Sequence, residues 1–294
     1  MFGRSIKIYL SDGSPSGLRH VEIANWSGQA IACPRSRFSE LKNWNESQRP
    51  GVYFLLERHS TDQKNTVYIG ESENVFKRLT DHDRKKDFWN EVIIFTSKDE
   101  NLTKSHIKYL EARLTGLTIE ADRCNIENGN KPTESTLPRA DKDAMEEFIH
   151  NSKILLGTLG HKLLEPINSS RVKSEGIYSD TLRERVLYFS VNGLLSEGKQ
   201  SDEGFILLKD SELSLQTTSS IPGKINLLRD RLLEEKVLIE QKDKLILSKD
   251  IVLSSPSYAA ALVAGTSRSG PQSWKDSAGK TLKSLEESLV KSEV

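Results

Sequence analysis

The chain has 294 residues, of which 36% are hydrophobic and 29% are charged, a composition typical of a folded protein with buried cores. Lysine plus arginine and aspartate plus glutamate both number 42. This balance argues against a protein that coats nucleic acid non-specifically, but it is compatible with an enzyme that has one local basic cleft. The length favours two domains.

The two cysteines, Cys33 and Cys124, are isolated in the sequence. They exclude a disulfide framework and lack the spacing of metal ligands, so a reducing, cytoplasmic setting fits. The N-terminus lacks the apolar segment of a signal peptide, and no apolar run approaches the length of a membrane span. We therefore expect a cytoplasmic protein that does not associate with membranes.

Residues 1–48 predict a β-rich N-terminal arm. Apolar and polar residues alternate at 6–10, which is the pattern of a half-buried strand, and further short strands are expected at 21–23 and 29–33. Basic side chains in this arm can either touch phosphate or simply face solvent.

Residues 49–160 predict an α+β domain built on a small three-stranded antiparallel sheet flanked by helices. The strands are rich in β-branched and aromatic residues, and the last of them is apolar enough to be buried on both faces. In chain order, the expected elements are a strand at 51–57, a polar loop, a strand at 66–70, a helix from 75, a strand at 91–95, a helix at 106–117 and a helix at 139–160.

The stretch 161–180, polar above all from residue 165, predicts a linker. Residues 181–294 then predict a second, small α+β domain. Its best-signalled element is a helix that Ser255 caps and Pro256 begins. Its other expected elements are strands at 187–191, 204–208, 237–239, 244–247 and 251–253, and a helix at 222–233.

Glu111 is the most informative single residue for function. It lies four residues after Ile107 and three before Leu114, so it shares the apolar side of its helix. A carboxylate beside a core-facing stripe is costly unless a partner compensates it. The partner can be a structural Arg or Lys, a hydrogen-bonding tyrosine or a divalent metal.

The preceding segment adds two phenols, Tyr53 and Tyr68, and a helix with Arg78 and His82 one turn apart on one face. These groups suit phosphodiester hydrolysis. A metal withdraws charge from the phosphate, an arginine stabilises the negative charge of the transition state, and a phenol or imidazole takes the proton of the attacking water.

Two tripeptides carry a family resemblance, Gly51-Val52-Tyr53 and Tyr68-Ile69-Gly70. With Arg78, Glu111 and a following asparagine in this order, residues 49–135 resemble the GIY-YIG nuclease superfamily. Its members include homing endonucleases, some restriction enzymes and an incision subunit of bacterial excision repair. The resemblance implies a divalent-metal-dependent DNA endonuclease; the alternative is a protein of this fold that binds nucleic acid, or serves as an adaptor, without cleaving.

The resemblance also implies roles for individual residues. Tyr53 would help to deprotonate the attacking water, and Tyr68 would hydrogen-bond near the scissile phosphate. Arg78 would bind phosphate, His82 matches a histidine of the restriction-enzyme branch, and Glu111 would hold one Mg²⁺ or Mn²⁺.

The remaining positions of the resemblance are less specific. Asn128 is favoured over Asn125 as the site asparagine, and Gly70 would let the strand approach DNA. Position 71 is glutamate where some relatives carry lysine. Lys77, Arg84 and Lys85 are candidate DNA-binding residues, or the solvated end of a helix.

The C-terminal domain also resembles a known family. Segments at 204–211, 254–260 and 274–276 are similar to a domain of unknown function often fused to GIY-YIG nucleases. A helix followed by short paired strands suits either a winged-helix-like reader of DNA or a module for a partner protein or a second copy.

Overall fold

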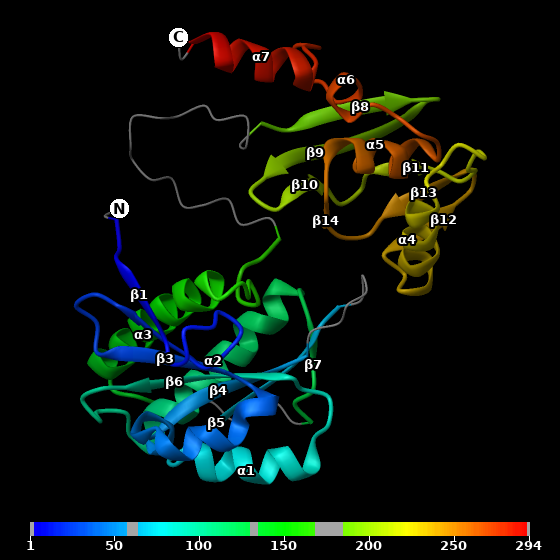
Figure 1. Cartoon of the computed structure of the whole chain (residues 1–294). Coiled ribbons are helices and arrows are strands. Elements are labelled where there is room, and N and C mark those ends of the chain that lie inside the picture. The colour runs from blue at the N-terminus through cyan, green and yellow to red at the C-terminus, as the bar shows by residue number, and fades with distance from the viewer. Residues whose placement is uncertain (1–2, 58–63, 130–134, 168–184, 293–294) are drawn as a thin grey trace. The chain divides into compact units, whose positions relative to one another are not determined.

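The computed structural model describes residues 3–57, 64–129, 135–167 and 185–292 (Figure 1). The chain divides into two compact units, Met1–Pro166 and Ile167–Val294. Both combine helices with antiparallel sheet, so the predicted α+β class is confirmed. None of the helices in these described ranges is both long and apolar enough to cross a membrane.

A seven-stranded sheet forms the first unit, in the order β1-β2-β3-β6-β4-β5-β7. All neighbours pair antiparallel except β5 and β7, which are parallel. Its strands are β1 (Ile6–Leu10), β2 (Arg19–Ile23), β3 (Gly28–Pro34), β4 (Gly51–Leu56), β5 (Thr66–Ser72), β6 (Glu91–Ser97) and β7 (Asn125–Ile126).

The expected three-stranded sheet is therefore only the part β6-β4-β5 of a larger one. The expected arm at 1–48 is not separate, because β3 pairs with β6 along its whole length and Val21, Ala30 and Ala32 are buried in the same core as the strands that follow. These residues can be buried only if the arm joins the sheet.

Helices cover both faces of this sheet (Figure 1). Helix α1 (Val75–Lys85) and the 3₁₀ segments η1 (Arg35–Asn43) and η2 (Asn45–Gln48) lie on one side, and helices α2 (Lys104–Ala121) and α3 (Arg139–Thr158) lie on the other. The alternation of side chains along β4 divides the core accordingly. Phe54 packs towards α2 and α3, whereas Tyr53 and Leu55 pack towards α1.

The helix ends follow from local side-chain chemistry. Asn74 accepts from the backbone N–H of Lys77 and so caps α1, while Thr103 and His106 form a reciprocal capping box at the start of α2. Helix α1 begins at residue 75, as expected, and runs to Lys85. The apolar stripe of α2 lies in the core, as predicted.

The predicted linker at 161–180 begins too early. The start of this stretch is part of the first unit, where His161, Leu163 and Leu164 are buried. The two leucines belong to the same core as α3 and cover apolar surface at its end. Residues 168–180 of the expected linker lie outside the described residues, as does most of the polar loop between β4 and β5.

The second unit contains a four-stranded sheet, β14-β10-β9-β8, and a three-stranded sheet, β11-β13-β12. Ser255 caps α5 as predicted, and Trp274 and Phe205 are fully buried in the core. Its elements are β8 (Leu187–Val191), β9 (Leu194–Ser201), β10 (Gly204–Leu207), β11 (Glu212–Ser214), α4 (Gly223–Glu234), β12 (Leu238–Gln241), β13 (Lys244–Leu247), β14 (Ile251–Leu253), α5 (Pro256–Ala264), α6 (Gly270–Ser273) and α7 (Leu282–Ser292).

Candidate functional site

Three ring side chains form the centre of the candidate site in the first unit. The hydroxyl oxygen of Tyr53 lies 2.9 Å from Nε2 of His82. The ring of Tyr68 lies 4.9 Å from that of His82 and 6.2 Å from that of Tyr53, between centroids. Tyr53 and His82 are buried and Tyr68 is half-buried, so Tyr68 is the phenol that reaches the surface.

The position of Tyr53 depends on Gly70. The two residues face each other across β4 and β5, and a Cβ atom at Gly70 would lie 2.4 Å from the Tyr53 hydroxyl oxygen and 2.9 Å from the Tyr68 ring. The missing side chain therefore leaves space for the phenol of Tyr53. Contact between Gly70 and DNA stays a prediction.

Arg78 extends the site towards solvent. It lies four residues before His82 on α1, and its side chain is exposed. Its guanidinium is within hydrogen-bonding and electrostatic reach of both phenols, which raise the pKa of Arg78 against the opposing effect of burial. A permanent positive charge thus stands beside the two tyrosines, as anion binding requires.

Glu111 approaches from α2, the helix on the other face of the sheet. The charge of Arg78 acts on Glu111, and the charge of Glu111 acts on Tyr53. Burial, followed by the nearby charge of Glu71, raises the pKa of Glu111 to about 7. Of the three partners considered from sequence, the described residues supply neither a salt bridge nor a tyrosine hydrogen bond to this carboxylate.

The pKa values of Tyr53 and His82 are shifted in opposite directions. Burial, with the neighbouring Tyr68, raises the pKa of Tyr53 above its ordinary value. Burial and the charges of Arg78 and Lys86 lower the pKa of His82 to about 4. At neutral pH the phenol is therefore protonated and the imidazole neutral, and the histidine tautomer decides which of the two donates the hydrogen bond.

Asn128 is hydrogen-bonded through its side chain to the backbone of β5, between Tyr68 and Gly70. Its side-chain oxygen accepts from the backbone N–H of Ile69 at 3.0 Å, and its amide nitrogen donates to the carbonyl of Ile69 at 2.7 Å. Asn125 is exposed and pairs through its backbone with Thr66. Within the described residues, Asn128 is thus the asparagine whose side chain is hydrogen-bonded to β5, the strand that carries Tyr68 and Gly70.

The candidate DNA-binding residues Lys77, Arg84 and Lys85 are exposed on α1, on the same helix as Arg78. Lys86, which follows the helix, lies instead over the ring of Tyr68, with its ammonium 4.6 Å from the ring centroid. It thereby adds a second positive charge beside the half-buried phenol.

Sequence reasoning missed Lys104, whose ammonium contacts both carboxylate oxygens of Glu71, at 2.9 and 2.8 Å. Its spacing of seven residues from Glu111 places it on the same side of α2 and is a signal that points to it. Within the described ranges no group of three or more His, Cys, Asp and Glu side chains is placed to hold a metal ion.

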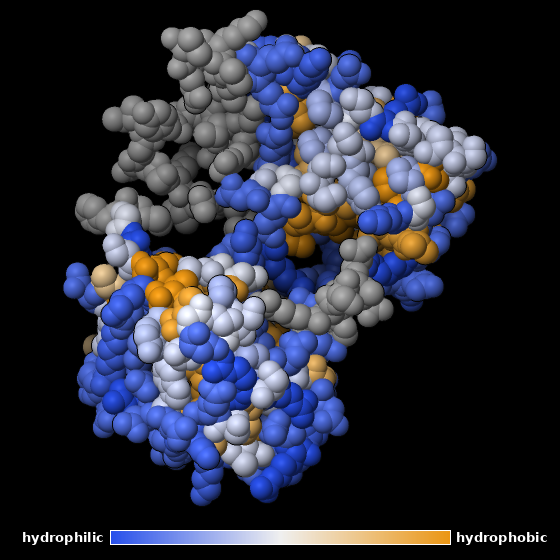
Figure 2. Space-filling view, in the orientation of Figure 1, coloured by the Kyte–Doolittle hydropathy of each residue, from blue (hydrophilic) through white to orange (hydrophobic). Residues whose placement is uncertain are grey.

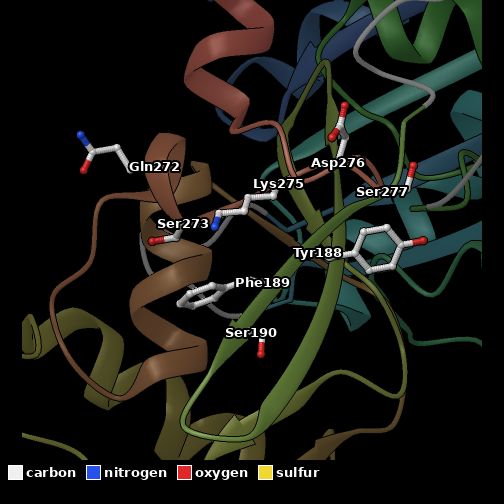
Figure 3. A pocket seen from close by; sticks show the side chains of 9 residues that line it. Tyr188, Phe189, Ser190, Gln272, Ser273, Lys275, Asp276 and Ser277 are labelled. Carbon is white, nitrogen blue, oxygen red and sulfur yellow. The ribbon is translucent and has the colours of Figure 1, made fainter.

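The second unit has a hollow of about 570 Å³ between β8 on one side and the end of α6 with the segment that follows it on the other. Its lining side chains do not converge. Figure 3 shows Tyr188 and Lys275 pointing in opposite directions, although their backbones are paired. This hollow therefore lacks the focused set of polar groups found in the first unit.

The fold and the site define an α+β chain whose first unit gathers two tyrosines, a histidine, an arginine and a carboxylate. In the second unit, residues 187–286 match the family described as a domain of unknown function, DUF4357, which agrees with the resemblance noted for the C-terminal domain. No curated protein and no solved structure matches the chain.

Proposed function

We propose that the first unit is a divalent-metal-dependent DNA endonuclease of the GIY-YIG type, which hydrolyses phosphodiester bonds. The observation that carries this proposal is the convergence of Tyr53, Tyr68, Arg78 and His82, which come from two strands and a helix, with the charge of Glu111 from a second helix. Four of these groups lie on β4, β5 and α1, and the charge of Glu111, on α2, interacts with Tyr53 and Arg78.

A divalent cation fits the chemistry of Glu111. The carboxylate is half-buried, and the described residues give it no hydrogen bond or ion pair. Mg²⁺ is often held through one or two carboxylates together with water and substrate phosphate. When bound, the cation withdraws negative charge from the phosphate and lowers the pKa of coordinated water.

The other residues divide the remaining tasks. Arg78, exposed beside both phenols, is suited to bind the scissile phosphate and to stabilise its transition-state charge. Tyr68 reaches the surface and is suited to hydrogen-bond a phosphate oxygen or the attacking water. Tyr53 is fully buried and its pKa is raised, so we assign it the role of holding His82 rather than that of the proton acceptor.

One observation favours a second candidate function, a protein of this fold that binds nucleic acid without cleaving it. His82 has a pKa of about 4 and Tyr53 a raised pKa, so neither group is matched to proton transfer at neutral pH in the state described. A phosphate-binding surface built from Arg78 and its neighbours would not need such a base.

The test is cleavage of plasmid and single-stranded DNA with Mg²⁺, with Mn²⁺ and with chelator. We expect metal-dependent nicking that is lost in Glu111→Gln and retained in Glu120→Gln, an exposed carboxylate on the same helix. Arg78→Ala should lose cleavage and weaken DNA binding. Binding without cleavage under every metal would favour the second candidate, and absence of both would refute each of them.

We propose that the second unit directs the first to its target, and that the protein works in the cytoplasm. The exposed side chains of α4 include Lys224, Asp230 and Glu234, so the helix presents both signs of charge. Both cysteines are buried and free, as suits a reducing compartment. Comparison of full chain and residues 1–166 on DNA would separate a DNA-reading from a protein-binding role for this unit, and sedimentation of the full chain would test a homodimer.

A further inference from the structure

The start of helix α2 places two positive charges in line with Glu111. Lys104 and Lys108 precede Glu111 by seven and three residues, so all three lie on one side of the helix. Helix α2 packs against β5, and Glu71 follows Gly70 directly on that strand. The side of α2 that carries Glu111 therefore faces the end of the strand that carries Tyr68.

Glu71 is held by Lys104 in a geometry stronger than that of an ordinary surface pair. The Lys104 ammonium contacts both Glu71 carboxylate oxygens, and the Glu71 side chain is only 14% exposed, against 43% for Lys104. Pairs between fully exposed charges contribute little because water screens them. A carboxylate with so little exposure keeps a larger effect on its surroundings.

The charges of this pair act on Glu111 with opposite signs. Glu71 disfavours the ionised form of the Glu111 carboxyl group, whereas Lys104 favours it. A cation bound at Glu111 would experience the same two charges with the signs reversed: attraction from Glu71 and repulsion from Lys104. The two residues are thus a balanced pair placed beside the one carboxylate of the site that has no partner within the described residues.

We propose that Glu71 and Lys104 are positioning residues that set how tightly a divalent cation binds at Glu111. This inference rests on the proposed metal site. In this arrangement, Glu71 supplies a second negative charge to the cation, and Lys104 keeps Glu71 in place and partly neutralises it. The ion pair thereby keeps Glu71 from binding the cation directly, so that coordination positions stay available for water and phosphate.

The test is the affinity of the full chain for Mn²⁺, measured by electron paramagnetic resonance of the free ion and by calorimetry without DNA. Removing the negative charge in Glu71→Gln should weaken binding about tenfold, and removing the positive charge in Lys104→Met should tighten it by a similar factor. In the double variant the affinity should return close to that of the wild type, because both charges are gone.

A matched control comes from the other end of α2. Lys64 forms an ion pair of 2.6 Å with Asp122, which follows the helix, and Lys64→Met changes the net charge by the same amount as Lys104→Met. Its Mn²⁺ affinity should equal that of the wild type. If both lysine variants tighten binding equally, net charge is the cause and the inference is wrong.

Two further outcomes separate this inference from the proposed function. Wild-type protein that binds no Mn²⁺, or binds it equally well as Glu111→Gln, refutes the metal site and the inference with it. Binding that is lost in Glu111→Gln but unchanged in both Glu71→Gln and Lys104→Met leaves the metal site standing and refutes the inference alone.

Discussion

The buried hydroxyl group of Tyr53 and Nε2 of His82 share a hydrogen bond of 2.9 Å. Both groups are neutral at neutral pH, because burial, the first cause in each case, raises the pKa of the phenol and lowers the pKa of the imidazole. The bond joins β4, which carries Tyr53, to α1, which carries His82 and Arg78. It therefore links the position of Arg78 to the sheet.

Tyr53→Phe should show the value of this bond. The change removes the hydrogen-bond partner that the described structure gives to His82 Nε2 and leaves a buried ring nitrogen without one, which costs about 1–3 kcal/mol of unfolding free energy. Urea unfolding measures the loss, and plasmid nicking should fall with it. Tyr9→Phe, at a tyrosine that is 54% exposed, is the control and should leave both unchanged.

Stability should depend on pH through His82. Its pKa is lowered to about 4 in the folded protein, chiefly by burial, whereas an unfolded histidine titrates near 6.5. The unfolded chain therefore binds the extra proton first, so this contribution to stability is present above about pH 6.5 and is lost as the pH falls towards 4. The expected loss is about 1–3 kcal/mol.

Denaturant unfolding between pH 4 and 7 tests this dependence. His82→Gln should flatten the curve in that range, while His150→Gln, at an exposed histidine of α3, should keep the slope of the wild type. A wild-type slope in His82→Gln would show that other groups cause the acid sensitivity.

Glu111 should give the stability of the protein the opposite pH dependence. Its pKa is raised to about 7 by burial and by Glu71, so the protonated form is favoured on folding. This contribution is fully present below the unfolded pKa of about 4.3 and is lost as the pH rises through 7. Without metal, Glu111→Gln should be more stable than wild type at pH 8 by about 1–2 kcal/mol, and equally stable at pH 4.

Thermal unfolding with chelator at the two pH values measures that difference. Added Mg²⁺ should raise the melting temperature of the wild type and not that of Glu111→Gln, because a ligand that binds only the folded state stabilises it. A wild type that is the more stable protein at pH 8 with chelator would contradict the raised pKa.

Gly70→Ala should disrupt the site by overlap. The new Cβ would lie 2.4 Å from the Tyr53 hydroxyl oxygen and 2.5 Å from its ring, too close for a buried ring that has no free space to enter. We expect the free energy of unfolding to fall by about 1–3 kcal/mol. Cleavage should be lost as well. Gly116→Ala, where a Cβ meets nothing within 4 Å, should be neutral or stabilising.

Substitutions at Asn128 and Asn125 should have clearly different effects. Asn128→Asp replaces the amide that donates to the Ile69 carbonyl by a group that repels it, so β5 should be destabilised by about 1–3 kcal/mol and cleavage reduced. Asn125→Asp changes an exposed side chain and should have little effect. Hydrogen exchange of the Ile69 amide and DNA cleavage measure the effects of the two substitutions. Equal effects of Asn128→Asp and Asn125→Asp would exclude Asn128 as the asparagine of the site.

The sequence alone determined much of the local structure. Alternation and β-branched residues predicted most of the strands, a capping residue predicted the start of α5, and helical spacing placed Glu111 beside an apolar stripe. Each of these signals is short-range, so a window of a few residues contains it. The order of the tyrosines, Arg78 and Glu111 was likewise legible from the chain.

Only the tertiary structure decided which residues meet. The sheet places β3 beside β6 and so brings the first 48 residues into the same core, a pairing that no local pattern specifies because its partners are some sixty residues apart. The same packing buries Tyr53 against His82, fixes Asn128 rather than Asn125 on Ile69, and joins Lys104 to Glu71. Burial and neighbouring charge then set the pKa values, since both depend on what surrounds a group in space.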